Sequence, residues 1–328
     1  MDGRERLEQT EGRTTRRPAS GLTIAPGAYP ALFQVADASS VSGQRVYRRL
    51  VEVELSFVLL GAAFGGAGAF LPEWASLFAS LASACLIASI ALKLINRQSG
   101  NDQRWFDGRA VAETVKTQAW RFMMRLAPYE SDATADEAFA TDVLSAIQAR
   151  PDLQQPLELL PATASQISDV MLAVRGLSLE DRRTLYVEQR IDEQAAWYRR
   201  RAVANRTNGR RWFWISLAGQ VVAAGIAMAS IFQPNAPVAN LVGLFAAIAA
   251  SATAWTQLGR HDELSKAYAL AYQELMTIRT VAARVASERD LDHLVTTGEA
   301  AISREHTMWM AKLGRPHSKS SRGGDAEP

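Results

Sequence analysis

The chain has 328 residues, with 36 lysines and arginines against 34 aspartates and glutamates, for a net charge of +2. Proteins that bind nucleic acid usually carry a clear basic excess, so we expect no nucleic-acid partner. The single cysteine, Cys85, can form neither an internal disulfide nor a cysteine-based zinc site.

Both ends of the chain are polar. Residues 1–30 carry five arginines among acidic residues and lack the continuous apolar stretch of a signal peptide. Residues 314–328 are equally polar. We expect both segments to be disordered arms.

Residues 55–71, 74–92, 212–232 and 238–255 form four apolar runs without Asp, Glu, Lys, Arg or His. About 20 such residues cross the hydrocarbon core of a bilayer as a helix. Buried helices of a water-soluble bundle are the alternative, but they would show a charged stripe at the helical period, and none of the runs has one. The sequence therefore predicts an all-α integral membrane protein: two transmembrane helical hairpins (four spanning helices) with long helical cytosolic extensions. Runs free of charge also argue against a proton relay, a pump or a voltage sensor.

The residues that flank the runs predict their orientation. Pro72 and Glu73 separate the first pair of runs and residues 233–237 separate the second pair, and neither turn contains Lys or Arg. Basic residues favour the cytoplasmic side, so we expect both short turns outside and the remaining segments, with both termini, in the cytoplasm. The opposite ends of the runs carry Arg45, Arg48, Arg49, Lys93, Arg97, Arg199, Arg200, Arg201, Arg206, Arg210, Arg211 and Arg260.

Small residues inside the runs are candidates for close helix packing. Gly61 and Gly65 have the spacing at which two helices approach closely, and Ala246, Ala250 and Ala254 repeat it in the fourth run. This packing lies either within a hairpin or between copies of the chain.

Polar residues inside the runs are candidates for the lining of a pore. Ser76, Ser80 and Ser83 share one helix face, and Gln220 lies within the third run. The serines either bond to their own backbone or form a weakly polar seam that faces water when several chains assemble.

Residues 103–122 predict an amphipathic helix directly after the first hairpin. Trp105, Arg109, Glu113, Lys116 and Trp120 lie on one face of this helix. Arg109 can pair with Glu113 at i+4, and Glu113 with Lys116 at i+3. We expect both tryptophans to lie against a partner helix.

The remaining segments predict further cytosolic helices. One covers 136–150 within a linker of residues 129–176. Another starts at the capping residue Ser178 and runs towards residue 212, with Asn208 and Gly209 as a candidate break. Two more cover 262–287 and 291–313. The two halves of the chain thus share one plan: an approach helix, an apolar hairpin and a helix that follows it.

No catalytic or metal-binding pattern is legible. The four histidines are scattered without metal-ligand spacing, and no Ser-His-Asp or Cys-His set occurs. We expect neither a cofactor nor an enzyme. The histidines are His261, His293, His306 and His317.

The residue patterns around both hairpins resemble the SLATT group, the SMODS- and SLOG-associating two-transmembrane domains of bacteria. Residues 105–116 (WFDGRAVAETVK) with Trp120 and Phe122 prompt this resemblance, as do residues 36–40 (ADASS). Before the second hairpin, it rests on residues 182–186 (RRTLY) and 190–194 (RIDEQ) with Trp197 and Tyr198. The second unit departs from the pattern, because no Trp-x-x-x-Arg-x-x-x-Glu run follows its hairpin.

The resemblance implies two SLATT-like units in tandem, over residues 31–128 and 177–313. It implies a membrane effector of a bacterial conflict or defence response, which oligomerises and forms or gates a pore in the inner (cell) membrane. A separate nucleotide-sensing partner chain would trigger it. The alternative is a membrane-anchored helical scaffold that recruits a cytosolic partner.

Overall fold

The computed structural model describes residues 21–149 and 165–312, and within them every regular element is a helix. The first half holds α1 (Ala31–Ala67), α2 (Ala75–Gln98), α3 (Asn101–Met123) and α4 (Ala135–Gln148). Short helices α6 (Asp169–Arg175) and α7 (Leu179–Tyr186) lead into the second half. There, a π-helical turn, η4 (Val187–Asp192), precedes α8 (Glu193–Phe232), α9 (Val242–Gly259), α10 (His261–Ala282) and α11 (Glu288–Lys312).

Four helical segments are long and apolar enough to cross a membrane, one each in α1, α2, α8 and α9. The predicted all-α membrane architecture is therefore confirmed. Only 11% to 17% of each apolar window is buried against the rest of the chain, so most of its surface is left for lipid or for another protein.

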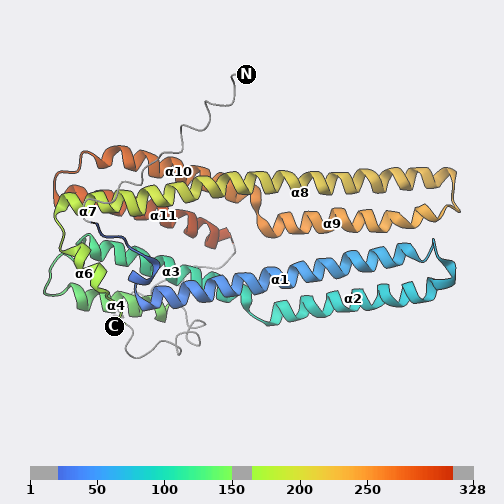
Figure 1. Cartoon of the computed structure of the whole chain (residues 1–328), viewed down its shortest axis with the longest axis horizontal. Helices are drawn as coiled ribbons and strands as arrows, with labels where there is room; N and C mark the ends of the chain where they lie inside the picture. The colour runs from blue at the N-terminus through green and yellow to red at the C-terminus, as the bar shows by residue number, and fades with distance from the viewer. Residues whose placement is uncertain (1–20, 150–164, 313–328) are drawn as a thin grey trace, which may run out of the picture.

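Proline begins both hairpin turns. The 3-10 turn η2 (Pro72–Trp74) links α1 to α2, and η5 (Pro237–Leu241) links α8 to α9. Proline lacks an amide donor, which the first residue of a helix does not need. Both turns lie at the same end of the elongated molecule, with the four spanning segments side by side (Figure 1).

The opposite end of the molecule is a helical bundle that we call the base. It comprises α3, α4, α6, α7, η4, α10 and α11, with the parts of α1 and α8 that precede their apolar runs (Figure 1). The largest fully buried side chains all belong to the base, among them Trp120, Tyr129, Tyr186, Tyr198 and Phe139. The hydrophobic core that fixes the fold thus lies outside the spanning segments.

The two halves repeat one arrangement. In the first, α1 packs against both α2 and α3; in the second, α8 packs against both α9 and α10. The chain turns sharply at the base end of each hairpin, where Gly100 and Arg260 adopt left-handed backbone conformations. Glycine adopts this conformation without strain, whereas Arg260 must tolerate it.

The predicted break at Asn208 and Gly209 is wrong, because α8 continues through both residues. Gly209 is buried where α10 begins, and a Cβ atom there would lie 3.0 Å from Oδ1 of Asp262. The glycine therefore permits a close helix crossing. The predicted capping of the helix at Ser178 is confirmed, since its hydroxyl accepts a hydrogen bond from the Asp181 amide.

Residues 21–30, at the end of the predicted N-terminal arm, lie against the base. The Ile24 amide donates a hydrogen bond to Gln189 Oε1, and the Gln189 amide group donates one to the Leu22 carbonyl. The Ser168 hydroxyl donates to the Ala28 carbonyl. The rest of that arm, the tail 314–328 and the prolines predicted to break the linker fall outside the described residues.

Truncating Trp120 tests where the core lies. Trp120→Ala should destabilise the protein by about 3–5 kcal/mol, because its side chain is fully buried. Trp214→Ala is the matched control: this tryptophan is 61% exposed on α8, and its loss should lower the thermal midpoint in detergent far less. Equal midpoints for the two variants would contradict a core confined to the base.

Candidate functional site

The predicted motif helix is α3, and it crosses α1 at very short range. A Cβ atom on Gly108 would lie 2.8 Å from the Ala36 carbonyl oxygen, and one on Gly43 would lie 2.9 Å from the Trp105 amide nitrogen. The Ser40 hydroxyl donates a hydrogen bond of 2.9 Å to the Trp105 carbonyl across this crossing. Gly43 had not been singled out from the sequence, although a glycine facing an aromatic-rich helix is a signal of close approach.

Several of the predicted motif residues of α3 contact one another or Tyr29, which lies just before α1. The Arg109 and Glu113 side chains form an ion pair of 2.7 Å, as their i+4 spacing predicted. Lys116 lies over the Tyr29 ring, 5.1 Å from its centroid, and burial lowers the pKa of this lysine. Trp120 donates its indole hydrogen to the Tyr29 hydroxyl at 3.1 Å.

A buried carboxylate, Glu299 of α11, lies next to this motif face. Arg190 of η4 donates two hydrogen bonds to its oxygens, at 2.8 and 2.7 Å, and the two side chains are 2% and 4% exposed. Tyr186 donates a third hydrogen bond at 3.2 Å. Thr117 of α3 donates a fourth at 2.7 Å. Glu299 is thus the point where the two halves of the base meet through polar contacts.

Two local features make room for this cluster. The π-helical turn η4 is wider than an α-helix, and both Arg190 and Ile191 are buried on it. A Cβ atom on Gly298 would lie 2.5 Å from the Tyr186 hydroxyl, so only glycine lets α11 come this near. Burial raises the pKa of the Tyr186 hydroxyl well above its usual value, which keeps it a hydrogen-bond donor to Glu299.

Two further buried arginines hold the C-terminal end of α3. Arg175 donates 2.9 Å to the Phe122 carbonyl, and Arg182 donates 2.7 Å to the Met124 carbonyl. Carbonyls at a helix C-terminus lack partners and attract positive charge. Asp132 pairs with Arg175 and Glu288 pairs with Arg182. Asp132 follows the first hairpin in the chain and Glu288 follows the second. Through the two arginines, both segments are therefore connected to the C-terminal end of α3.

In the spanning region, Gln220 lies on an open groove between α8 and α9, which we call the hairpin groove. Its volume is about 490 Å³, and its lining includes Gln220 and Ala223 of α8 and Ala246, Ala250, Thr253 and Gln257 of α9. Within the described part of the chain, neither glutamine side chain has a hydrogen-bond partner. The alanines of the predicted small-residue stripe therefore line a depression instead of a closed helix contact.

Two of the three predicted serines donate hydrogen bonds to the backbone of their own helix. Ser80 donates 2.8 Å to the Ser76 carbonyl, and Ser83 donates 2.9 Å to the Ala79 carbonyl. All three serines lie exposed on α2. Ser80 and Ser83 thus bond to their own helix, whereas the Ser76 hydroxyl has no partner among the described residues. The structure does not bring the three serines near Gln220.

The two glycines of the predicted pair, Gly61 and Gly65, have different neighbours. A Cβ atom on Gly61 would touch α2, 3.4 Å from the Cys85 Cβ, whereas one on Gly65 would meet no atom within 4 Å. Gly66, a small residue beside this pair, faces the second hairpin, because its Cβ would lie 3.2 Å from the Asn240 carbonyl oxygen. The two hairpins thus touch near their tips.

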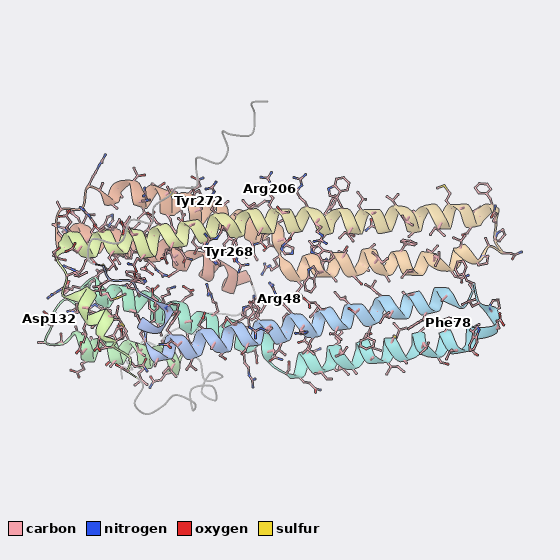
Figure 2. All side chains as sticks on the ribbon, in the orientation of Figure 1. Arg48, Phe78, Asp132, Arg206, Tyr268 and Tyr272 are labelled. Carbon is pink, nitrogen blue, oxygen red and sulfur yellow. The ribbon has the colours of Figure 1, made fainter. Side chains whose placement is uncertain are left out.

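Among residues 21–149 and 165–312, no group of three or more His, Cys, Asp or Glu side chains could hold a metal ion. Charged side chains of the base instead pair with one another, and Asp132, at the far end of the base (Figure 2), pairs with Arg175.

Two family models match the chain. Residues 30–183 match SLATT_3, described as SMODS and SLOG-associating 2TM effector domain 3. Residues 186–309 match SLATT_1, described as SMODS and SLOG-associating 2TM effector domain 1. No curated protein and no solved structure matches the chain.

Removing the charge of Glu299 tests the buried pair. Glu299→Gln should destabilise the base by about 3–5 kcal/mol, because Arg190 is then left buried without a counterion. Asp192→Asn removes the partly exposed pair with Arg279 and should lower the stability by less than about 1 kcal/mol. Denaturant unfolding of both variants in detergent compares the two, and equal losses would show that burial of the pair is unimportant.

The pKa of Tyr29 predicts a loss of stability at high pH. Burial raises it to about 12, so this tyrosine contributes stability that is complete below its unfolded pKa of about 10 and lost as the pH rises to about 12. Tyr29→Phe should therefore lose less stability than wild type between these pH values. Denaturant titrations at each pH measure the difference, and parallel curves would contradict it.

Proposed function

The chain belongs to the SLATT effector families, as two SLATT domains in tandem, and from this premise we propose that it assembles in a membrane and forms or gates a pore. The observation that carries the proposal is the hairpin groove. An amide in hydrocarbon without a hydrogen-bond partner is unfavourable by about 2–7 kcal/mol. Gln220 is in this situation in the single chain, and a second copy or a water-filled passage would relieve it.

In this proposal, the base controls how the two hairpins pack. Thr117 belongs to the first SLATT domain, whereas Arg190 and Glu299 belong to the second. Their hydrogen bonds favour one arrangement of the two domains, and α1 and α8 continue from the base into the spanning region without a break. A trigger that weakens these contacts would change the packing of the hairpins.

The trigger in this proposal is a separate nucleotide-sensing chain, in keeping with the SMODS and SLOG association that the family descriptions name. The basic ends of the spanning segments support a cytoplasmic position for the base and both termini, in a bacterial inner membrane. The function needs no catalysis by this chain.

A mild change in the base tests the gating. Thr117→Val keeps the side-chain shape but removes the hydrogen bond from the first domain to Glu299. Such a bond to a charged group contributes about 1.5–3 kcal/mol, so its loss should favour the open arrangement about tenfold or more. Bacteria that express Thr117→Val should depolarise more than those that express wild type, as a membrane-potential dye reports.

The same assay tests the hairpin groove. Adding Gln220→Leu or Ala250→Leu to Thr117→Val should abolish the depolarisation, because the groove is filled or loses its polar group. Ala218→Leu is the control: it adds the same side chain on an exposed position of α8 outside the groove and should leave depolarisation intact. If Thr117→Val causes no depolarisation, the pore proposal fails, and a membrane-anchored scaffold becomes the better explanation.

A further inference from the structure

Where the base meets the spanning segments, both domains contribute arginines that lie over aromatic rings, an arrangement that we call the arginine cluster. Arg48 of α1 lies over the Trp105 ring of α3, 5.8 Å from its centroid. Arg201 of α8 lies over the Trp197 ring at 5.5 Å. Tyr268 of α10 packs edge-on against Trp197, with centroids 5.3 Å apart. Figure 2 shows Arg48 and Tyr268 between the two halves of the molecule at this level.

The two arginines share this space without a counterion. Within the described residues, neither forms an ion pair, and both side chains are exposed. The pKa of Arg48 is lowered, first by the protein around it and then by the charge of Arg201, whereas Glu52, one helical turn along α1, acts in the opposite direction. Arg48 thus stays accessible to solvent, although protein surrounds part of its side chain.

A third polar group lies near the arginine cluster. Nδ1 of His261 hydrogen-bonds with Asn205 Oδ1 at 2.9 Å, whereas its Nε2 is buried without a partner among the described residues. Burial and then the charge of Arg48 lower the pKa of this histidine, while Asp262 acts to raise it. The positive charge here therefore comes from Arg48 and Arg201 and not from His261.

We propose that the arginine cluster, formed by Arg48, Arg201, Trp105 and Tyr268, binds a phosphate-bearing anion. Guanidinium groups bind phosphate oxygens in a bidentate manner, and the aromatic rings beneath them fix their orientation. The anion is the headgroup of an acidic phospholipid or a soluble phosphate compound. Because Arg48 and Trp105 come from the first SLATT domain and Arg201 and Tyr268 from the second, the bound anion bridges the domains and favours the arrangement that holds these four residues together.

The test uses the full chain in nanodiscs and does not depend on conductance. In the first arm, nanodiscs contain phosphatidylcholine with or without phosphatidylglycerol, and native mass spectrometry measures which lipid stays bound. In the second arm, nanodiscs contain phosphatidylcholine alone, and ATP is titrated while tryptophan fluorescence is followed. The variants are Arg48→Gln and Arg201→Gln.

Arg206→Gln is the matched control, because Arg206 lies on the outer side of α8, away from Arg48 (Figure 2), and the substitution removes the same charge. Arg48→Gln and Arg201→Gln should each weaken binding in one of the two arms about fivefold, since a basic residue near a membrane surface contributes about 1 kcal/mol. Arg206→Gln should bind as wild type does. A response in the first arm identifies a lipid headgroup, and a response in the second identifies a soluble phosphate compound.

Two results would overturn the proposal. One is that wild type binds neither probe. The other is that Arg206→Gln weakens binding as much as Arg48→Gln and Arg201→Gln do, which indicates a general effect of charge. Thermal midpoints of all variants in the same nanodiscs show whether each is folded, and Arg48→Lys, which keeps the charge but not the bidentate geometry, should show intermediate binding.

Discussion

The Glu299 carboxylate lies in a part of the base that water does not reach, where a charge is tolerated only if its oxygens are fully hydrogen-bonded. Its partners come from α3, α7 and η4, so α11 contacts all three elements through this one group. Gly298 and the wide turn at η4 then follow as requirements: without them, Tyr186 and Arg190 could not reach the carboxylate. Much of the organisation of the base can be understood from this single group.

The sequence was sufficient to predict what depends on local pattern. The four spanning helices follow from runs without charge, the Arg109 and Glu113 pair from its i+4 spacing, and the start of α7 from the capping residue Ser178. Features that depend on distant residues were missed. Arg190 and Glu299 are separated by 109 positions, and nothing in either helix alone indicates that they meet. Gly209 shows the same limit, because a glycine beside an asparagine resembles a helix end until α10 is placed against it.

The candidate residues in the spanning region show why small and polar side chains are hard to interpret from sequence. The serines on α2 and Gln220 on α8 have similar polarity, yet a serine hydroxyl reaches the carbonyl of the preceding turn and a glutamine amide does not. Their requirements in lipid therefore differ. Ser80 and Ser83 are satisfied by their own helix, whereas the Gln220 amide has no partner among the described residues. Gly61, Gly65 and Gly66 are close in sequence but face α2, open space and the second hairpin respectively.

The length of α8 has a mechanical consequence. Its 40 residues extend about 60 Å as one uninterrupted helix, roughly twice the hydrocarbon thickness of a bilayer. Such a helix is stiff, and its first residues are held in the base. A tilt of only about 5° at the base would carry the tip of the second hairpin about 5 Å sideways, given the rise per residue. Ångström-scale adjustments around a buried carboxylate are therefore amplified at the far surface of the membrane.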